Sequence, residues 1–61
     1  MEQATESRFI TAKEIAKDAN ISATMAYRVI RQLNEKLEEQ GFFTFRGKTL
    51  RRAYYEYTGG R

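Results

Sequence analysis

The 61-residue sequence contains neither cysteine nor histidine. It therefore has no disulfide and lacks the thiolate and imidazole ligands that structural zinc sites use. A chain of this length can form one small domain with one small core, and such chains often need a disulfide or a metal. We expect this one to be held together by packing, without a cofactor and aided at most by a partner.

The same two absences weigh against catalysis. Without histidine or cysteine, acid–base or nucleophilic chemistry would rest on exposed carboxylates, lysines or tyrosines. The sequence shows no metal-spaced cluster of such groups, and so short a chain has no room for a cleft between two lobes. We therefore expect neither enzymatic activity nor a small-molecule substrate.

A long apolar run is also missing, and the first eight residues, MEQATESR, are polar and of mixed charge. These features predict neither a membrane span nor a signal peptide, so we expect no membrane contact and a cytoplasmic location. Residues 1–8 are typical of a flexible tail, and residues 59–61 of a frayed end. The folded domain is expected to cover residues 9–58.

The net positive charge is concentrated in the last third of the chain. Residues 1–40 carry six basic and seven acidic side chains, whereas residues 41–61 carry five basic side chains and one acidic one. The net charge of +3 therefore consists of −1 from the first segment and +4 from the second. A basic segment of this kind favours a polyanionic partner.

A capping box marks the start of a first helix. Thr11 and Glu14 have the spacing at which each side chain accepts a hydrogen bond from the backbone N–H of the other residue. The helix is expected to end near Ala19, because Asn20 is one of the few residue types that tolerate a left-handed backbone. Its expected buried residues are Ile15, Ala16 and Ala19.

A second, longer helix is expected from Ala23 to Gln40. Ser22 is a suitable N-cap, and Gly41 suits the position just beyond the C-terminus. The apolar residues keep helical spacing and should form the buried face: Ala26, Val29, Ile30, Leu33 and Leu37. The opposite face is polar or amphipathic and comprises Thr24, Tyr27, Arg28 and Arg31.

After Gly41 the pattern changes to that of a small hairpin. Phe42–Phe45 favours a strand, the turn falls at Arg46–Lys48, and Thr49 and Leu50 begin the return. We expect at least two of the three aromatic side chains in this segment to fill the core rather than to stack on nucleobases. They are Phe42, Phe43 and Phe45.

The last apolar residues, Leu50, Ala53, Tyr54 and Tyr57, recur at helical spacing. This favours a third, short helix, although the tyrosines and Thr58 also suit a strand. The predicted fold class is therefore mainly α with a small β-hairpin, arranged as a winged helix-turn-helix in a single small domain.

Two helices joined by the tight turn at residues 20–22 are typical of a helix-turn-helix, which presents the start of its second helix to the major groove of DNA. A plain pair of helices with no ligand is the alternative. Five side chains suit a DNA partner: Ser22, Thr24, Tyr27, Arg28 and Arg31.

In that role the hydroxyls of Ser22 and Thr24 would bind phosphate at the helix N-terminus. Tyr27 would contact a thymine methyl group or a phosphate. Arg28 would bind guanine, and Arg31 would bind the DNA backbone. Each side chain also has a simpler interpretation, with Ser22 as a cap alone, Tyr27 as part of the core and the arginines paired with Glu35.

The basic turn provides a second candidate surface. Arg46, Lys48, Arg51 and Arg52 lie within seven positions of one another. Beside a helix-turn-helix, a basic hairpin is a wing, which can follow phosphates or enter a minor groove. The alternative is a solvated turn that keeps the protein soluble.

Residues 9–57 resemble small winged helix-turn-helix proteins of Gram-positive phages and of integrative or conjugative elements, which are excisionase-like proteins or small transcriptional regulators. The resemblance is carried by the segment YRVIRQLNEKLEEQGF and the RGK turn. It implies double-stranded DNA as a partner, with further copies of the chain on adjacent sites or a recombinase as others. By position it assigns Ser22, Ala23, Thr24, Tyr27 and Arg28 to the recognition surface, and Arg46, Gly47 and Lys48 to the wing.

A second hypothesis from the residues is a protein-interaction module, such as an antirepressor or an accessory subunit. In that case the long second helix would dock on a partner through an apolar seam. The seam would consist of Ile30, Leu33 and Leu37.

Overall fold

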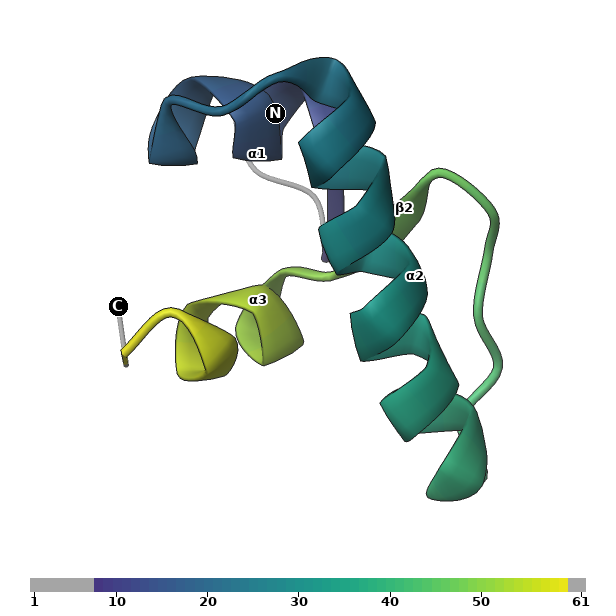
Figure 1. Cartoon of the computed structure of the whole chain (residues 1–61). Coiled ribbons are helices and arrows are strands. Elements are labelled where there is room, and N and C mark those ends of the chain that lie inside the picture. Colours follow the sequence, from purple (N-terminus) through teal and green to yellow (C-terminus); the bar gives the residue numbers. More distant parts are fainter. Residues whose placement is uncertain (1–7, 60–61) are drawn as a thin grey trace, which may run out of the picture.

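The computed structural model describes residues 8–59 as three helices and two short strands (Figure 1). The predicted tail at residues 1–7 and the predicted frayed end at residues 60–61 lie outside the described residues. The elements follow the order β1 (Phe9–Thr11), α1 (Ala12–Ala19), α2 (Ala23–Glu39), β2 (Lys48–Leu50) and α3 (Arg51–Tyr57). No helix in the described part of the chain is long and apolar enough to cross a membrane.

The predicted boundaries of α1 are confirmed. The Thr11 hydroxyl accepts the backbone N–H of Glu14 at 3.2 Å, and the Glu14 carboxylate accepts the N–H of Thr11 at 3.0 Å. Asn20 ends the helix in the left-handed conformation, with φ of 57°. Ala19, however, is exposed and Ala12 is buried in its place, because Ala19 is the last helical residue and the chain turns away there.

Helix α2 begins at Ala23 as predicted and ends at Glu39, one residue before the predicted end, and its predicted apolar face is buried except for Val29, which is half-buried. Ser22 caps its start by accepting the N–H of Met25 at 3.1 Å, and Gly41 follows its end with φ of 93°. The proposed docking seam is not available, because Ile30, Leu33 and Leu37 are all buried within the chain itself. The second hypothesis, a protein-interaction module, therefore lacks the exposed apolar seam on α2 that it requires.

The sheet pairs different segments from those predicted. Strand β2 pairs with β1 in an antiparallel register that places Ile10 opposite Thr49, and Phe42–Phe45 is not a strand. An isolated bridge between Phe45 and Lys48 is what remains of the expected hairpin. This register buries both Ile10 and Thr49, whereas Phe42–Phe45 runs beside α2.

The prediction that two phenylalanines fill the core was also wrong. Phe42, Phe43 and Phe45 are 51%, 83% and 43% exposed. Phe9, Phe43 and Phe45 form an aromatic cluster on the surface, with edge-to-face contacts at 5.3 and 5.7 Å between ring centroids. The largest fully buried side chain is that of Tyr54, from the third helix.

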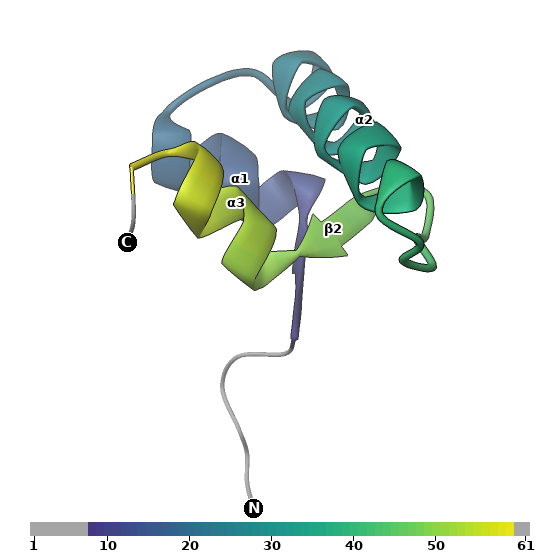
Figure 2. The same ribbon diagram turned by 90° about the horizontal axis from the view of Figure 1, so that it is seen from below.

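Helix α3 is formed as the spacing predicted, and it packs near α1 and the sheet (Figure 2). The Tyr54 hydroxyl donates to the Asp18 carboxylate of α1 at 2.8 Å. Burial and the nearby Asp18 carboxylate raise the pKa of Tyr54 to about 12. The chain is thus a mainly helical winged helix-turn-helix domain, with a sheet whose first strand comes from the N-terminal side of α1.

Candidate nucleic-acid interface

The first turn of α2 is open to solvent and carries no acidic side chain. Ser22, Ala23 and Thr24 are all exposed there, with the Ser22 hydroxyl oxygen accepting the cap hydrogen bond. The partial positive charge of a helix N-terminus is therefore not compensated by a carboxylate on this turn. Such an end favours the approach of an anion such as a phosphate.

The next two turns present unpaired basic side chains. Thr24, Arg28 and Arg31 recur at i, i+4 and i+7, so they share one face of α2, and all three are exposed. Neither arginine forms an ion pair with any residue between 8 and 59, so the alternative pairing with Glu35 is not formed. Tyr27 is 56% exposed and is therefore not part of the core.

The turn of residues 45–48, called here the 45–48 turn, lies against this part of α2. Gly47 has φ of 83°, a conformation that glycine adopts without strain. A Cβ atom on Gly47 would lie 3.7 Å from Cε1 of Tyr27, so the tip of the turn and the tyrosine ring are neighbours. The predicted turn is confirmed, and the fold brings it next to the second helix.

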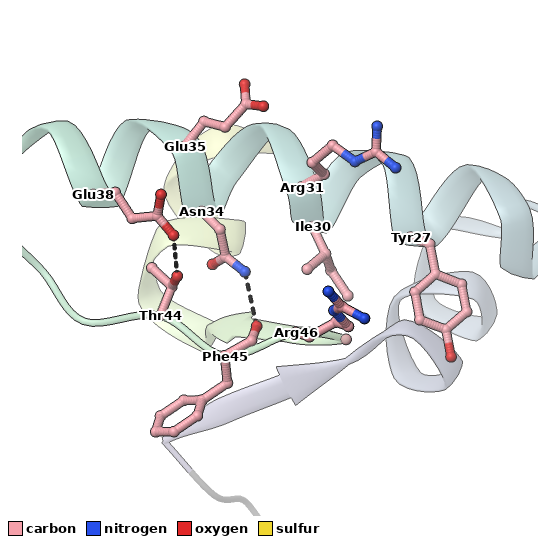
Figure 3. Close-up of a pocket in the computed structure, with 10 residues that line it drawn as sticks. Tyr27, Ile30, Arg31, Asn34, Glu35, Glu38, Thr44, Phe45 and Arg46 are labelled. Carbon is pink, nitrogen blue, oxygen red and sulfur yellow. Dashed lines mark hydrogen bonds between the residues drawn. The ribbon is translucent and has the colours of Figure 1, made fainter.

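A groove of about 780 Å³ separates α2 from the turn (Figure 3). Arg31 and Arg46 line it toward the Tyr27 end, and Glu35 and Glu38 line it toward the C-terminal end of α2. The groove is therefore basic at one end and acidic at the other. A polyanion is attracted to the end that contains Tyr27 and repelled from the end that contains Glu38.

Residues 1–57 match the family model described as the Mga helix-turn-helix domain. The chain belongs to this family. The Mga-family domain is also 31% identical over 51 residues to a protein named ICEBs1 excisionase from Bacillus subtilis (strain 168), a match that covers 84% of this chain and 80% of that protein. No solved structure matches the chain. The resemblance to excisionase-like helix-turn-helix proteins is confirmed.

The remaining predicted basic residues of the Mga-family domain have different surroundings. The Lys48 ammonium lies 5.4 Å from the Phe45 ring centroid and 5.6 Å from that of Phe9, over the aromatic cluster. Arg52 is exposed on α3 and lies 3.9 Å from Glu56. Neither residue lines the groove between α2 and the turn.

Arg51 is part of the internal structure. Its side chain is 12% exposed, its guanidinium donates to the Phe9 carbonyl at 3.1 Å, and it pairs with Glu14 at 3.3 Å. The Thr11 backbone N–H and the Arg51 guanidinium together lower the pKa of Glu14, against a smaller opposing effect of burial. The fold thus ties Arg51 to β1 and α1 and does not bring it to the groove.

Sequence reasoning missed Asn34. This residue of α2 is 9% exposed, and its Nδ2 donates to the carbonyl oxygens of Phe45 at 3.0 Å and Lys48 at 3.1 Å. The signal was a polar residue seven positions after Tyr27, on the same side of the helix. The hydrophobic pattern of the Mga-family domain gives no reason to expect it to be buried.

Proposed function

We propose that this chain binds double-stranded DNA, with the first half of α2 in the major groove and the 45–48 turn on the phosphate backbone. Within α2, Arg28 reads base edges, Tyr27 and Thr24 contact bases or phosphates, and Arg31 binds the backbone. The cations of the turn, Arg46 and Lys48, neutralise phosphates beside it.

The observation that carries this proposal is the placement of Arg31 and Arg46 on opposite walls of one groove, next to Tyr27 and Gly47 (Figure 3). The arginines come from segments fifteen positions apart in the sequence, and neither has an ion-pair partner in the described part of the chain. Two unpaired guanidinium groups that border the same groove, beside the exposed first half of α2, suit phosphates and base edges.

The similarity to a protein named as an excisionase supports a role in a mobile element. We propose that the chain acts without catalysis of its own, either as an excisionase that directs a recombinase or as a small transcriptional regulator. Further copies on adjacent sites and a recombinase are the proposed protein partners. The DNA-binding role supports the expected cytoplasmic location.

Fluorescence anisotropy with labelled duplexes tests DNA binding. If about four to six phosphates are neutralised, the logarithm of the affinity should fall with the logarithm of salt concentration with a slope of roughly −3 to −6. Arg46→Ala should weaken binding to all duplexes and reduce the slope by about one.

Lys36→Ala is the control, because Lys36 is an exposed cation on α2 that lies outside the groove. We expect it to change affinity much less than Arg46→Ala. The absence of any duplex binding at low salt and micromolar protein would overturn the proposal, as would equal losses from the two variants.

Selection from a random duplex library, followed by footprinting of the preferred sequence, separates the two roles. A preferred site inside an attachment region of the element supports excision, and a site over a promoter supports regulation. Protection that extends as the protein concentration rises supports binding of several copies side by side.

A further inference from the structure

The 45–48 turn and the segment before it are held against one side of α2 at three positions. The Tyr27 ring lies beside Gly47, Asn34 donates to backbone carbonyls of the turn, and the Glu38 carboxylate accepts the Thr44 hydroxyl. The three α2 residues are spaced at i, i+7 and i+11, so they form one stripe along the helix. Figure 3 shows this stripe facing the turn across the groove.

Asn34 is at the centre of this stripe and binds both sides of the turn. Its two amide hydrogens go to the carbonyl oxygens of Phe45 and Lys48, which are the residues that bridge across Arg46 and Gly47. One side chain therefore fixes the entry and the exit of the turn. An amide with two donors can do this, whereas a carboxylate, which only accepts, cannot.

This arrangement has a cost in stability. The Asn34 Oδ1 atom is buried and has no hydrogen-bond partner in the described part of the chain. A buried acceptor without a partner opposes folding, whereas the two hydrogen bonds that Asn34 donates to the turn favour it. Besides these two hydrogen bonds, the asparagine contributes the geometry that it imposes on the turn.

The turn depends on this contact because the sheet supports it on one side only. Lys48 is held by the pairing of β2 with β1, but Phe45 has no strand behind it and is joined to Lys48 by an isolated bridge. The Phe45 carbonyl is therefore held by Asn34 of α2, while the Phe45 ring contacts Phe9 of β1.

We propose that Asn34 is a positioning residue for DNA binding: it fixes the 45–48 turn against α2 and so sets the separation of Arg31 and Arg46. This inference rests on the proposed function. Phosphates along a duplex have a fixed spacing, so two arginines bind them together at a lower entropic cost when their own separation is already fixed. A turn released from α2 would have to be ordered on binding, which lowers the affinity.

A double-mutant cycle on duplex affinity tests the inference. Asn34→Leu should weaken binding by roughly 3- to 10-fold, nearly as much as Arg46→Ala, and should reduce the salt slope by about one. Adding Asn34→Leu to Arg46→Ala should cost little more than either change alone, because both remove the same phosphate contact. Adding it to Arg28→Ala should multiply the two losses, because Arg28 does not depend on the turn.

The possible outcomes of this test are distinguishable. Losses that multiply in the Asn34→Leu, Arg46→Ala pair would overturn the inference, and so would unchanged affinity in Asn34→Leu alone. If circular dichroism shows that Asn34→Leu does not fold, Asn34→Ala replaces it, because it removes the same donors without adding volume. If the unaltered protein binds no duplex, the proposed function itself fails, and the inference about Asn34, which rests on it, fails with it.

Discussion

Two regions of the molecule use their charged side chains in opposite ways. Around α1 and α3, Glu14 pairs with Arg51, and Asp18 accepts the Tyr54 hydroxyl. Along the first half of α2 and the 45–48 turn, the arginines are exposed and make no ion pair within the described part of the chain. The first region holds the domain together, and the second leaves its positive charge available to a ligand.

Arg46 and Arg51 illustrate the difference. They are five positions apart in the same basic segment, and their composition and local pattern give no reason to treat them differently. The pairing of β2 with β1 separates them, because Arg51 follows the strand toward β1 and α1, whereas Arg46 precedes it beside α2. Proximity in a basic sequence is therefore a poor guide to which cations share a surface.

The largest expected effect is on stability at high pH. Because the pKa of Tyr54 is raised from 10.0 to about 12, unfolded tyrosine ionises before the folded residue does. Stability should therefore be intact below pH about 10 and should fall by up to roughly 2.5 kcal/mol as the pH rises to about 12. Thermal unfolding of the protein and of Tyr54→Phe measures this loss, which should be much smaller in the variant. If the stability of the two proteins falls in parallel as the pH rises, ionisation of Tyr54 does not cause the loss.

The second largest effect is expected on sequence discrimination, through the unpaired side chain of Arg28. Arg28→Ala should reduce discrimination between the preferred duplex and a scrambled one by about 2 kcal/mol, because a guanine contact is lost. The melting temperature should barely change, since the side chain is exposed and unpaired. Competition binding measures the discrimination, and an equal loss on both duplexes would place Arg28 on the backbone instead.

The third effect is expected on stability, in the region around α1 and α3 where the charged side chains are paired. Arg51→Ala should destabilise the domain by roughly 1–2 kcal/mol, because it removes the partner of Glu14 and leaves the Phe9 carbonyl without this donor. The protein that remains folded should bind duplex with nearly unchanged affinity. Urea unfolding and anisotropy measure the two quantities, and the reverse result, full stability with weakened binding, would contradict the division into regions.

The smallest effect is expected at the exposed pair on α3. Arg52 and Glu56 are separated by 3.9 Å and both side chains are largely in solvent. Arg52→Ala should change stability by less than about 0.5 kcal/mol. Its effect on duplex affinity should be smaller than that of Arg46→Ala, because Arg52 does not line the groove. A larger loss of affinity in the same anisotropy titration would extend the binding surface to α3.

Local signals predicted the parts of the fold that are determined locally. The capping box at Thr11, the left-handed Asn20 and the Ser22 cap gave the bounds of α1 and α2 almost to the residue. These features depend on hydrogen bonds within a few positions, and their sequence signatures are correspondingly clear.

The errors arose where distant segments compete. Phe42–Phe45 has the composition of a strand, but Phe9–Thr11 takes its place beside β2, because that pairing buries Ile10 against the core. Once the partner strand is misassigned, the exposure of the phenylalanines is misjudged as well. Asn34 was missed for the same reason, since its hydrogen bonds are made to backbone carbonyls eleven and fourteen positions away.

The central claim is that one surface, made by the first half of α2 and the 45–48 turn, receives duplex DNA. Titration of ¹⁵N-labelled protein with a short duplex of the preferred sequence tests it residue by residue. We predict that amide shifts concentrate at residues 24–31 and 45–48 and are small at residues 36–40 and 51–57. Shifts concentrated on α3, or on α2 without the turn, would contradict the claim.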